Sequence, residues 1–465
     1  MRRNLLITLT LICLLCAVAT AQDARAVLEA AIKNMGDIKS VQYSGSGAQF
    51  NLGQSVSPDT PWPRTELKSF TRAIGYDNQA SRNEAVGPNG SLAAQLLAGG
   101  KAWGQAGANI TPAAPAVATE RQLQIWLTPH GFLKGALANK AALKKNGGLM
   151  VVTFIAPDKH RVAGTISADN LVEKVEAWMD NPVLGDMRIE TVYSGYRDFG
   201  GIKFPGKIVQ KQGGHPVLDL TVTEAKANVP LDLAVPDAVV KFTPPVVQVA
   251  SEKLGEGIWY LTGGTHHSVL VEFADHVAVI EAPLNEARSI AVIAEVRKLA
   301  PNKPIRYLIN THYHFDHSGG LRTYVAEGAA IVTHESNRAF YEQTFNAPHT
   351  LNPDRQARAK RKARIQTMSA KHVLTDGARI VELHHIQGNP HNSGIVMAWL
   401  PKEKLLVEVD VFNPLAPNAP PPATPPPAMV NLYENIQRLT LDVNQIVALH
   451  GRVVPLAELK RTIGK

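Results

Sequence analysis

The sequence has almost no cysteine. Of its 465 residues only Cys13 and Cys16 are cysteines. Both lie in an opening segment that has two arginines, a short apolar stretch over 5–18 and an A-x-A pattern ending at Ala21. This arrangement is typical of a cleaved secretory signal, so we expect residues 1–21 to be a signal peptide. The mature chain then has no thiol, which excludes disulfide bonds and thiolate metal ligands.

The sequence also lacks a second long apolar run and a strong excess of charge. Nothing after the signal has the length of a membrane span, and the stretch over 5–18 is too short to favour the alternative of a retained anchor. The formal net charge is +8, which gives no warrant for nucleic-acid binding. An exported chain without cysteine is typical of a bacterial periplasm. We expect a periplasmic or secreted protein with no stable membrane span after signal cleavage. The sequence does not indicate its oligomeric state.

About 440 mature residues are too many for one ordinary core, so two domains are expected. Residues 22–240 begin with helical periodicity over 24–35 and continue as strand-like segments separated by Gly, Asn, Asp and Pro. One helix-like interruption lies at 120–127. These patterns predict a helix plus a curved antiparallel β-sheet. The region from Val172 to Gly214 weakly resembles the half-barrels of periplasmic lipoprotein carriers, which implies a concave apolar face.

A cluster of prolines marks a linker into a second domain over 246–465: Pro230, Pro236, Pro244 and Pro245. Beyond it, strand-like and helix-like segments alternate, with a helix expected at 289–299 and a buried strand at 305–309. This alternation predicts a layered α/β arrangement.

The stretch Thr311–Gly320, which reads THYHFDHSGG, follows that buried strand directly. It contains His312, His314, Asp316 and His317, and no structural requirement explains three imidazoles and a carboxylate within six residues. A loop at the end of a core strand holds its backbone rigidly, as a metal site needs. Because the loop cannot complete a site alone, further ligands must come from elsewhere.

Three later residues meet this need, each beside an expected strand. His391 lies in the turn GNPHNSG before an apolar strand, Asp410 ends the run LLVEV, and His450 follows the run IVAL. All three are side chains that bind metals, placed in otherwise apolar surroundings.

The motif HxHxDH with a downstream His, Asp and His resembles the metallo-β-lactamase superfamily of hydrolases over about residues 250–465. The resemblance implies an αββα sandwich with the site along one edge of its two sheets. It implies two zinc ions, although iron and manganese also suit such ligands. The ligands it implies are His312, His314 and His391 for one ion, Asp316, His317 and His450 for the other, and Asp410 bridging both. Glu281 stands where an Asp is usual.

These features predict an exported, zinc-dependent hydrolase whose metal-bridging hydroxide cleaves an ester, lactone, amide or related bond in a small molecule, acidic or apolar. Asp316 is the predicted catalytic residue, because it would both ligate a metal and orient the hydroxide. One alternative is a metallo-β-lactamase, which the carboxylate of Asp410 disfavours. Another is a carrier of an apolar ligand in which the metal domain is structural.

Two features are left open by the sequence. His266 and His267 are expected between early strands, in a loop that could contact substrate. Six basic residues lie within 355–364, either as a solvated surface or at the entrance for an acidic substrate.

Overall fold

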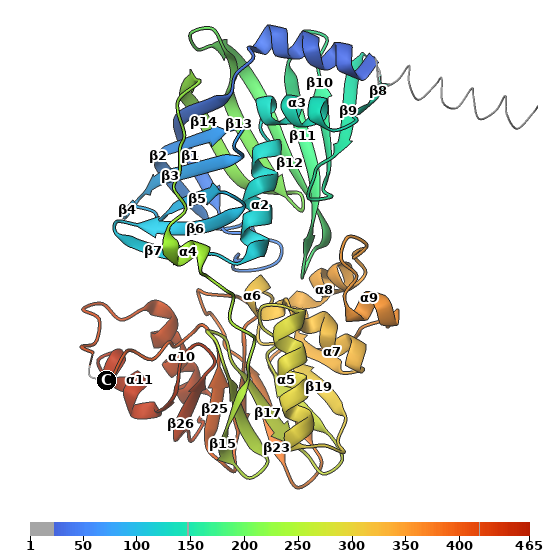
Figure 1. Ribbon diagram of the computed structural model, residues 1–465. Coiled ribbons are helices and arrows are strands. Elements are labelled where there is room, and N and C mark those ends of the chain that lie inside the picture. The colour runs from blue at the N-terminus through green and yellow to red at the C-terminus, as the bar shows by residue number, and fades with distance from the viewer. Residues whose placement is uncertain (1–22, 147, 418) are drawn as a thin grey trace, which may run out of the picture. The chain divides into compact units, whose positions relative to one another are not determined.

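The computed structural model describes residues 23–146, 148–417 and 419–465, so the predicted signal peptide lies outside the described part. The chain forms two compact units (Figure 1). Unit 1 extends to Asn51 and continues over Pro63–Met179 and Met187–Pro244; unit 2 comprises Leu52–Trp62, Asp180–Asp186 and Pro245–Lys465. The predicted domain over 22–240 differs from unit 1 mainly in two segments, Leu52–Trp62 and Asp180–Asp186, which pack with unit 2. Sequence patterns could not assign them, because the first is a loop between β1 and β2 and the second is the tip of the hairpin formed by β11 and β12.

Unit 1 is built on a 14-stranded sheet whose strand order is β7-β6-β5-β3-β2-β1-β14-β13-β12-β11-β10-β9-β8, with β4 paired to β3. The described ladders are antiparallel, as predicted. The strands are β1 (Ser40–Phe50), β2 (Arg64–Gly75), β3 (Ala80–Gly87), β4 (Gly90–Ser91), β5 (Ala94–Ala98), β6 (Lys101–Ala106), β7 (Asn109–Pro112), β8 (Ala142–Asn146), β9 (Leu149–Ile155), β10 (Arg161–Ile166), β11 (Val172–Asn181), β12 (Gly185–Asp198), β13 (Lys203–Gln212) and β14 (His215–Ala227).

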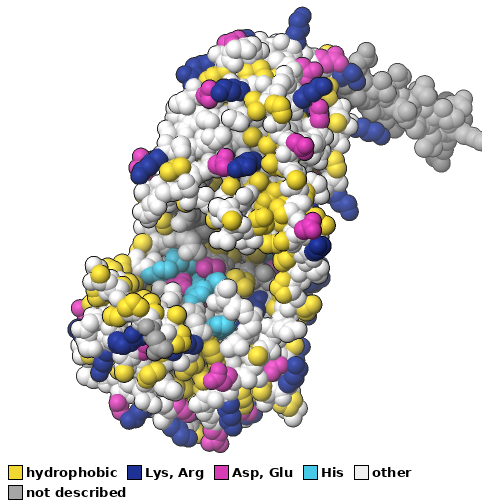
Figure 2. All heavy atoms as spheres, turned by 60° about the vertical axis from the view of Figure 1, so that its left-hand side comes forward, with side chains coloured by type: hydrophobic (Ala, Val, Ile, Leu, Met, Phe, Trp, Pro, Cys, Tyr) yellow, Lys and Arg dark blue, Asp and Glu magenta, His cyan; other side chains and the backbone are white. Residues whose placement is uncertain are grey.

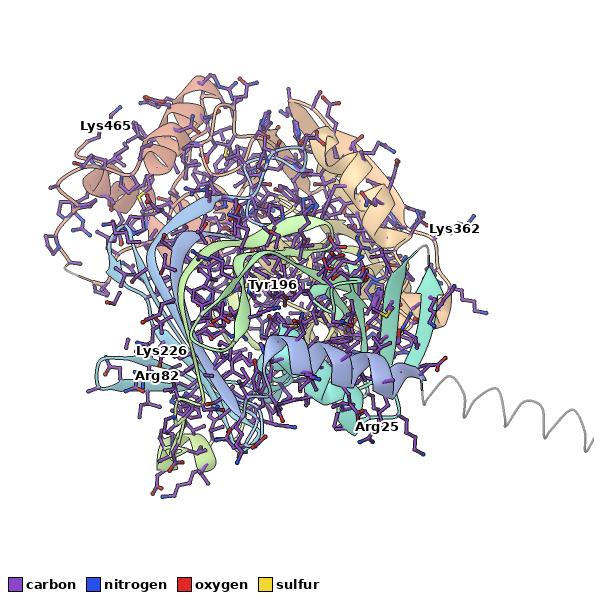
Figure 3. The ribbon with its side chains drawn as sticks, turned by 90° about the horizontal axis from the view of Figure 1, so that it is seen from above. Arg25, Arg82, Tyr196, Lys226, Lys362 and Lys465 are labelled. Carbon is purple, nitrogen blue, oxygen red and sulfur yellow. The ribbon has the colours of Figure 1, made fainter. Side chains whose placement is uncertain are left out.

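Helices accompany this curved sheet, which Figure 3 shows from above. A helix over 23–35 buries Leu28, Ala31 and Met35, as its 3.6-residue periodicity predicts. It is followed by α2 (Pro115–Trp126), α3 (Pro129–Ala138) and the short α4 (Asp237–Val240).

The sequence predicted one helix at 120–127, and the structure has two. Helix α2 begins earlier, with a proline in its first turn, where the missing N–H costs nothing. Helix α3 was missed because its Pro and two Gly residues favour a loop. Its N-cap Thr128 accepts a hydrogen bond from the Gly131 amide, and Phe132 and Leu133 are fully buried. Burial therefore outweighs weak helix propensity here.

Unit 2 contains two sheets. The 7-stranded sheet runs in the order β15-β16-β17-β18-β19-β20-β21 and the 6-stranded sheet in the order β22-β23-β24-β25-β26-β27. Their strands are β15 (Ala250–Gly255), β16 (Ile258–Thr262), β17 (Ser268–Glu272), β18 (Val277–Ile280), β19 (Ile305–Ile309), β20 (Ala330–His334), β21 (Arg364–Met368), β22 (Lys371–Thr375), β23 (Ile380–His385), β24 (Val396–Leu400), β25 (Leu405–Glu408), β26 (Gln445–Ala448) and β27 (Val453–Pro455). The helices are α5 (Glu286–Leu299), α6 (Phe315–Ser318), α7 (Leu321–Glu327), η1 (Glu335–Asn337), α8 (Arg338–Phe345), α9 (Arg355–Ala359), α10 (Pro427–Arg438) and α11 (Leu456–Thr462).

Three apolar clusters order these elements into layers. One joins the inner faces of the two sheets, with Val271 and Ile309 from one and Val396 and Val407 from the other. A second packs the outer face of the first sheet against α5, α7 and α8. The third packs the outer face of the second sheet against α10 and α11, and Figure 1 shows these helices on the far side from α5. The predicted αββα sandwich is confirmed. Within the described residues, no helix has the length and apolar character needed to cross a bilayer.

The arginines of the basic run 355–364 bind to neighbouring groups on the surface of unit 2. Arg355 pairs with Glu327, Arg358 with Glu286, and Arg361 donates to the Ala326 carbonyl. Figure 3 shows Lys362 projecting outward at the periphery. These contacts favour the solvated surface over an entrance for substrate.

Candidate metal centre

The loop after β19 brings its four candidate ligands to the edge of the two sheets. Strand β19 lies between parallel neighbours β18 and β20, so its end is fixed in the core. The chain then forms α6, and Gly319 and Gly320 connect α6 to α7. A Cβ on Gly319 would lie 2.0 Å from the Leu284 carbonyl oxygen. Only glycine permits this close approach, which presses the loop against the chain after β18.

The structure brings all seven predicted ligands together in two adjoining clusters. The first comprises His312, His314, His391 and Asp410. The second comprises His266, Asp316, His317 and His450. Within each cluster, one ligand atom per residue lies within 4.8 Å of the others. Figure 2 shows histidine side chains gathered in one place on the surface, with acidic side chains beside them.

Asp410 lies between the two clusters. Its Oδ2 is 3.1 Å from Nε2 of His391 and 2.9 Å from Nε2 of His317. Its Oδ1 is 2.9 Å from Nε2 of His450. One carboxylate therefore contacts histidines of both clusters, which is the geometry of a bridging ligand.

The spacing of the nitrogens fits a metal. Nε2 of His391 lies 3.3 Å from Nε2 of His312, and Nε2 of His450 lies 3.2 Å from Nε2 of His317. In a tetrahedral zinc site with ordinary zinc–nitrogen bonds, two ligand nitrogens are about 3.3 Å apart. Without a metal, each of these contacts requires that one imidazole of the pair donates its proton to the other.

Partners behind the ligands determine which nitrogen faces inward. His314 donates from Nε2 to the Ser55 carbonyl at 2.9 Å, which leaves its buried Nδ1 without a hydrogen-bond partner. His450 donates from Nδ1 to the Thr265 carbonyl at 3.1 Å. His317 places Nδ1 3.1 Å from Oε2 of Glu281. Such partners fix the tautomer and ring orientation of metal-binding histidines.

Two residues whose carboxylates contact the centre have positive backbone φ angles. Glu281 has φ 73° and Asp410 has φ 62°, in the left-handed region that non-glycine residues rarely adopt. Asp410 is held there by Glu408, whose Oε2 accepts from the amides of Val411 and Phe412. Such strain persists only where the surroundings impose it, and it concentrates at functional sites.

Electrostatics in the centre follow from burial and mutual contact. Burial opposes the charge on Asp410, but contacts with four histidines outweigh it and hold its pKa far below the ordinary value. Burial lowers the pKa of His314 to about 4. Burial also opposes the charge on His317, yet hydrogen bonds to three carboxylates raise its pKa well above 6.5. A metal that binds there must displace this proton, so binding competes with acid.

The sequence did not identify every residue of the centre. His266 was left open as a substrate contact, and the structure places its Nε2 3.4 Å from Oδ2 of Asp316. Its position after two glycines in the β16–β17 loop was the available signal. His267 instead packs on Tyr260. Gln54, which donates to Asp316 at 2.7 Å, had no signal because 262 residues separate the two.

Part of the chain matches a known family, and several solved structures are similar to it. Residues 261–407 match the family model described as the metallo-beta-lactamase superfamily. Similar solved structures include a metallo-beta-lactamase from Pontibacter korlensis, at 17% identity over 47% of this chain and 98% of that chain, with a TM-score of 0.36. The mono-zinc form of FIM-1 from Pseudomonas aeruginosa matches at 17% identity over 48% and 96%, with a TM-score of 0.37. Rubredoxin oxygen:oxidoreductase from Desulfovibrio gigas matches at 14% identity over 46% and 61%, also with a TM-score of 0.37.

Proposed function

The chain carries a domain of the metallo-beta-lactamase superfamily over residues 261–407, and from this premise we propose that it is an exported dizinc hydrolase of an ester, lactone, amide or related bond. The family match and the two His/Asp clusters indicate a metal-dependent hydrolase or a related enzyme. The observation that carries the proposal is Asp410, whose two oxygens contact histidines of both clusters.

In this proposal each cluster holds one ion. His312, His314 and His391 hold the first ion, and Asp410 joins it to the second. The second ion is held by Asp316, His317 and His450 together with Asp410, and His266 is a further candidate ligand. The unpartnered buried Nδ1 of His314 supports its role as a ligand, because an orphaned buried nitrogen is costly unless a ligand or metal meets it.

A pair of divalent ions at these clusters supplies Lewis acidity and lowers the pKa of water towards neutrality. The chain's own residues do the rest. Asp410 holds the two sets of histidines at a fixed separation, and Asp316 presents Oδ2 to the second cluster. Ser55 contacts the first cluster through its backbone carbonyl and not through its hydroxyl, and we propose no covalent intermediate.

The substrate approaches from the solvent side of the clusters. His391, Asp316 and His450 have side chains that are 26%, 34% and 20% exposed, whereas His312 and His317 are fully buried. In this proposal the substrate therefore places the bond to be cleaved next to these three exposed side chains. This exposure supports a small-molecule substrate whose remaining part stays outside the core.

The test is a substrate panel on the zinc-loaded full chain. It contains aryl esters, lactones, an unstrained aryl amide, nitrocefin as a β-lactam, and a phosphodiester, each measured with and without prior removal of metal by a chelator. We expect hydrolysis of an ester, lactone or amide that is lost on chelation and restored by zinc. Selective hydrolysis of nitrocefin would identify a β-lactamase instead.

The double variant His312→Ala/His314→Ala tests the metal dependence directly. It removes two ligands of the first cluster and should abolish hydrolysis. The matched control is His160→Ala, which removes an imidazole paired with Asp158 in unit 1 and should leave activity within about twofold, as expected away from the site. Full activity in the double variant after chelation would contradict the proposal.

A further inference from the structure

Unit 2 includes a segment from far outside its own sequence region. Residues Leu52–Trp62 connect strands β1 and β2 of unit 1 in sequence, yet they pack as part of unit 2. We call this segment the arm. It precedes the family match at residue 261 by about 200 residues, so nothing in that match accounts for it.

The arm contacts one carboxylate of the metal centre directly. Gln54 donates from Nε2 to Oδ1 of Asp316 at 2.7 Å. The other oxygen, Oδ2, is the one that faces the imidazoles of His266 and His317, at 3.4 and 3.5 Å. Gln54 therefore engages one oxygen and leaves the other directed into the second cluster.

The arm also supports the first cluster, through the backbone of Ser55. The Ser55 carbonyl accepts from Nε2 of His314 at 2.9 Å and from the Tyr313 hydroxyl at 2.8 Å. Ser55 is 1% exposed, so this interaction is shielded from water. The acceptor keeps the proton of His314 on Nε2, which directs the lone pair of Nδ1 into the site.

Separate contacts anchor the arm on both sides of these residues. The Ser393 amide, in the loop after His391, donates to the Val56 carbonyl at 2.8 Å. The Phe315 amide donates to the Gly53 carbonyl at 3.3 Å. The rings of Trp62 and Phe315 meet edge to face at 6.3 Å. The arm is thus fixed to the loop that carries His312 and His314 and to the loop that carries His391.

We propose that the arm is a structural part of the metal centre, and that Gln54 is a positioning residue that holds Asp316 for binding the second ion through Oδ2. The inference rests on the proposed function, because it assumes that the clusters bind metal. A carboxylate that pivots freely can turn either oxygen towards an ion, whereas a hydrogen bond to Oδ1 selects one orientation. Gln54 itself contacts no ligand atom of the first cluster, so its effect is specific to the second ion.

The test is a cobalt titration of metal-stripped full-length protein, followed by the visible absorption of bound Co²⁺. We expect the wild type to bind two equivalents. In Gln54→Met, which keeps the length of the side chain but has no donor, we expect the second equivalent to bind about 10- to 100-fold more weakly, as for other partners of metal ligands. The first equivalent should stay within about threefold.

Two further variants and the possible outcomes of the titration decide the role of Gln54. Gln54→Ala should match Gln54→Met; if Met instead restores wild-type binding, Gln54 only fills space and the inference is overturned. Gln95→Met, at an exposed glutamine of β5, should bind both equivalents as the wild type does. If Gln54→Met binds the first and the second equivalent with the same affinities as the wild type, the inference is overturned but the proposed function stays intact. A wild type that binds no cobalt removes the proposed function itself.

Discussion

Oε2 of Glu281 lies 3.1 Å from Nδ1 of His317, and both side chains are buried to 1% exposure or less. Oε1 of the same carboxylate accepts from the Thr311 amide at 2.6 Å. Glu281 thus connects the end of β18 to Thr311, at the start of the ligand-bearing stretch Thr311–Gly320. The same side chain orients the ring of His317. Glu281, which stands where an Asp is usual in the superfamily, therefore contacts His317 directly.

Replacing Glu281 with Gln should weaken binding of the second metal ion. The amide can still accept from Thr311, but it lacks the charge that favours the His317 tautomer with Nδ1 protonated. We expect about 10- to 100-fold weaker affinity for one ion, measured by competition with a chromophoric chelator. The control is Glu272→Gln, in β17 of the sheet that also contains β18. This variant alters an ion pair with Lys303 and should bind both ions as the wild type does. Unchanged affinity in Glu281→Gln would show that the contact is not coupled to metal binding.

Asp410→Asn should affect both ions, whereas His450→Ala should affect one. The aspartate contacts histidines of both clusters, but His450 belongs to the second cluster alone. Metal content after dialysis, measured by inductively coupled plasma mass spectrometry, should fall from about two ions to fewer than one in Asp410→Asn and to about one in His450→Ala. Equal losses in the two variants would contradict a bridging role.

Gly53→Ala should disturb the arm and with it the metal centre. The backbone of Gly53 has φ +70°, and an added Cβ would lie 2.2 Å from the ring of Phe315. Gly107 is a matched control, because it has φ +58° but nothing within 4 Å of an added Cβ. Both alanines carry a backbone penalty of about 1 kcal/mol, so only contact with Phe315 separates them. We expect weaker metal binding in Gly53→Ala alone; equal metal binding in both variants would exclude coupling through the arm.

His130 should make unit 1 less stable in acid. Burial lowers its pKa to about 4, from an ordinary value of 6.5. Between these values the unfolded chain binds a proton that the folded chain does not, so stability falls as pH drops from about 6.5 to about 4. The loss is about 2 kcal/mol by pH 5. Urea denaturation at pH 7.5 and pH 5 should show this loss in the wild type and a smaller one in His130→Gln. An identical pH dependence of stability in the wild type and in His130→Gln would contradict the claim that His130 is buried and neutral in the folded chain.

The fold was largely predictable from residue patterns. The bounds of the predicted strand Ile305–Ile309 are confirmed to the residue, although only Leu308 and Ile309 are fully buried, and the apolar stripe on α5 packs as its periodicity indicates. Helix α3 was not predictable, because its Pro and Gly residues favour a loop and only tertiary packing of Phe132 and Leu133 stabilises it.

The candidate site was predictable where residue type and local spacing carry the signal. The HxHxDH motif and the three later ligand candidates are visible as polar residues beside apolar strands. Gln54 and Ser55 are not visible, because a glutamine and a backbone carbonyl in a loop have no distinguishing pattern at a separation of more than 250 residues from their partners. Removal of residues 23–240 would therefore delete part of the proposed metal centre as well as unit 1.

The central claim is that two metal ions bind side by side and share Asp410. The most direct measurement is anomalous X-ray scattering at the zinc absorption edge from crystals of the full chain. We predict two anomalous peaks, one among His312, His314 and His391 and the other among His266, Asp316, His317 and His450, with Asp410 between them. Zinc-soaked crystals that show no anomalous peak at these clusters, or a single peak that does not contact Asp410, would contradict it.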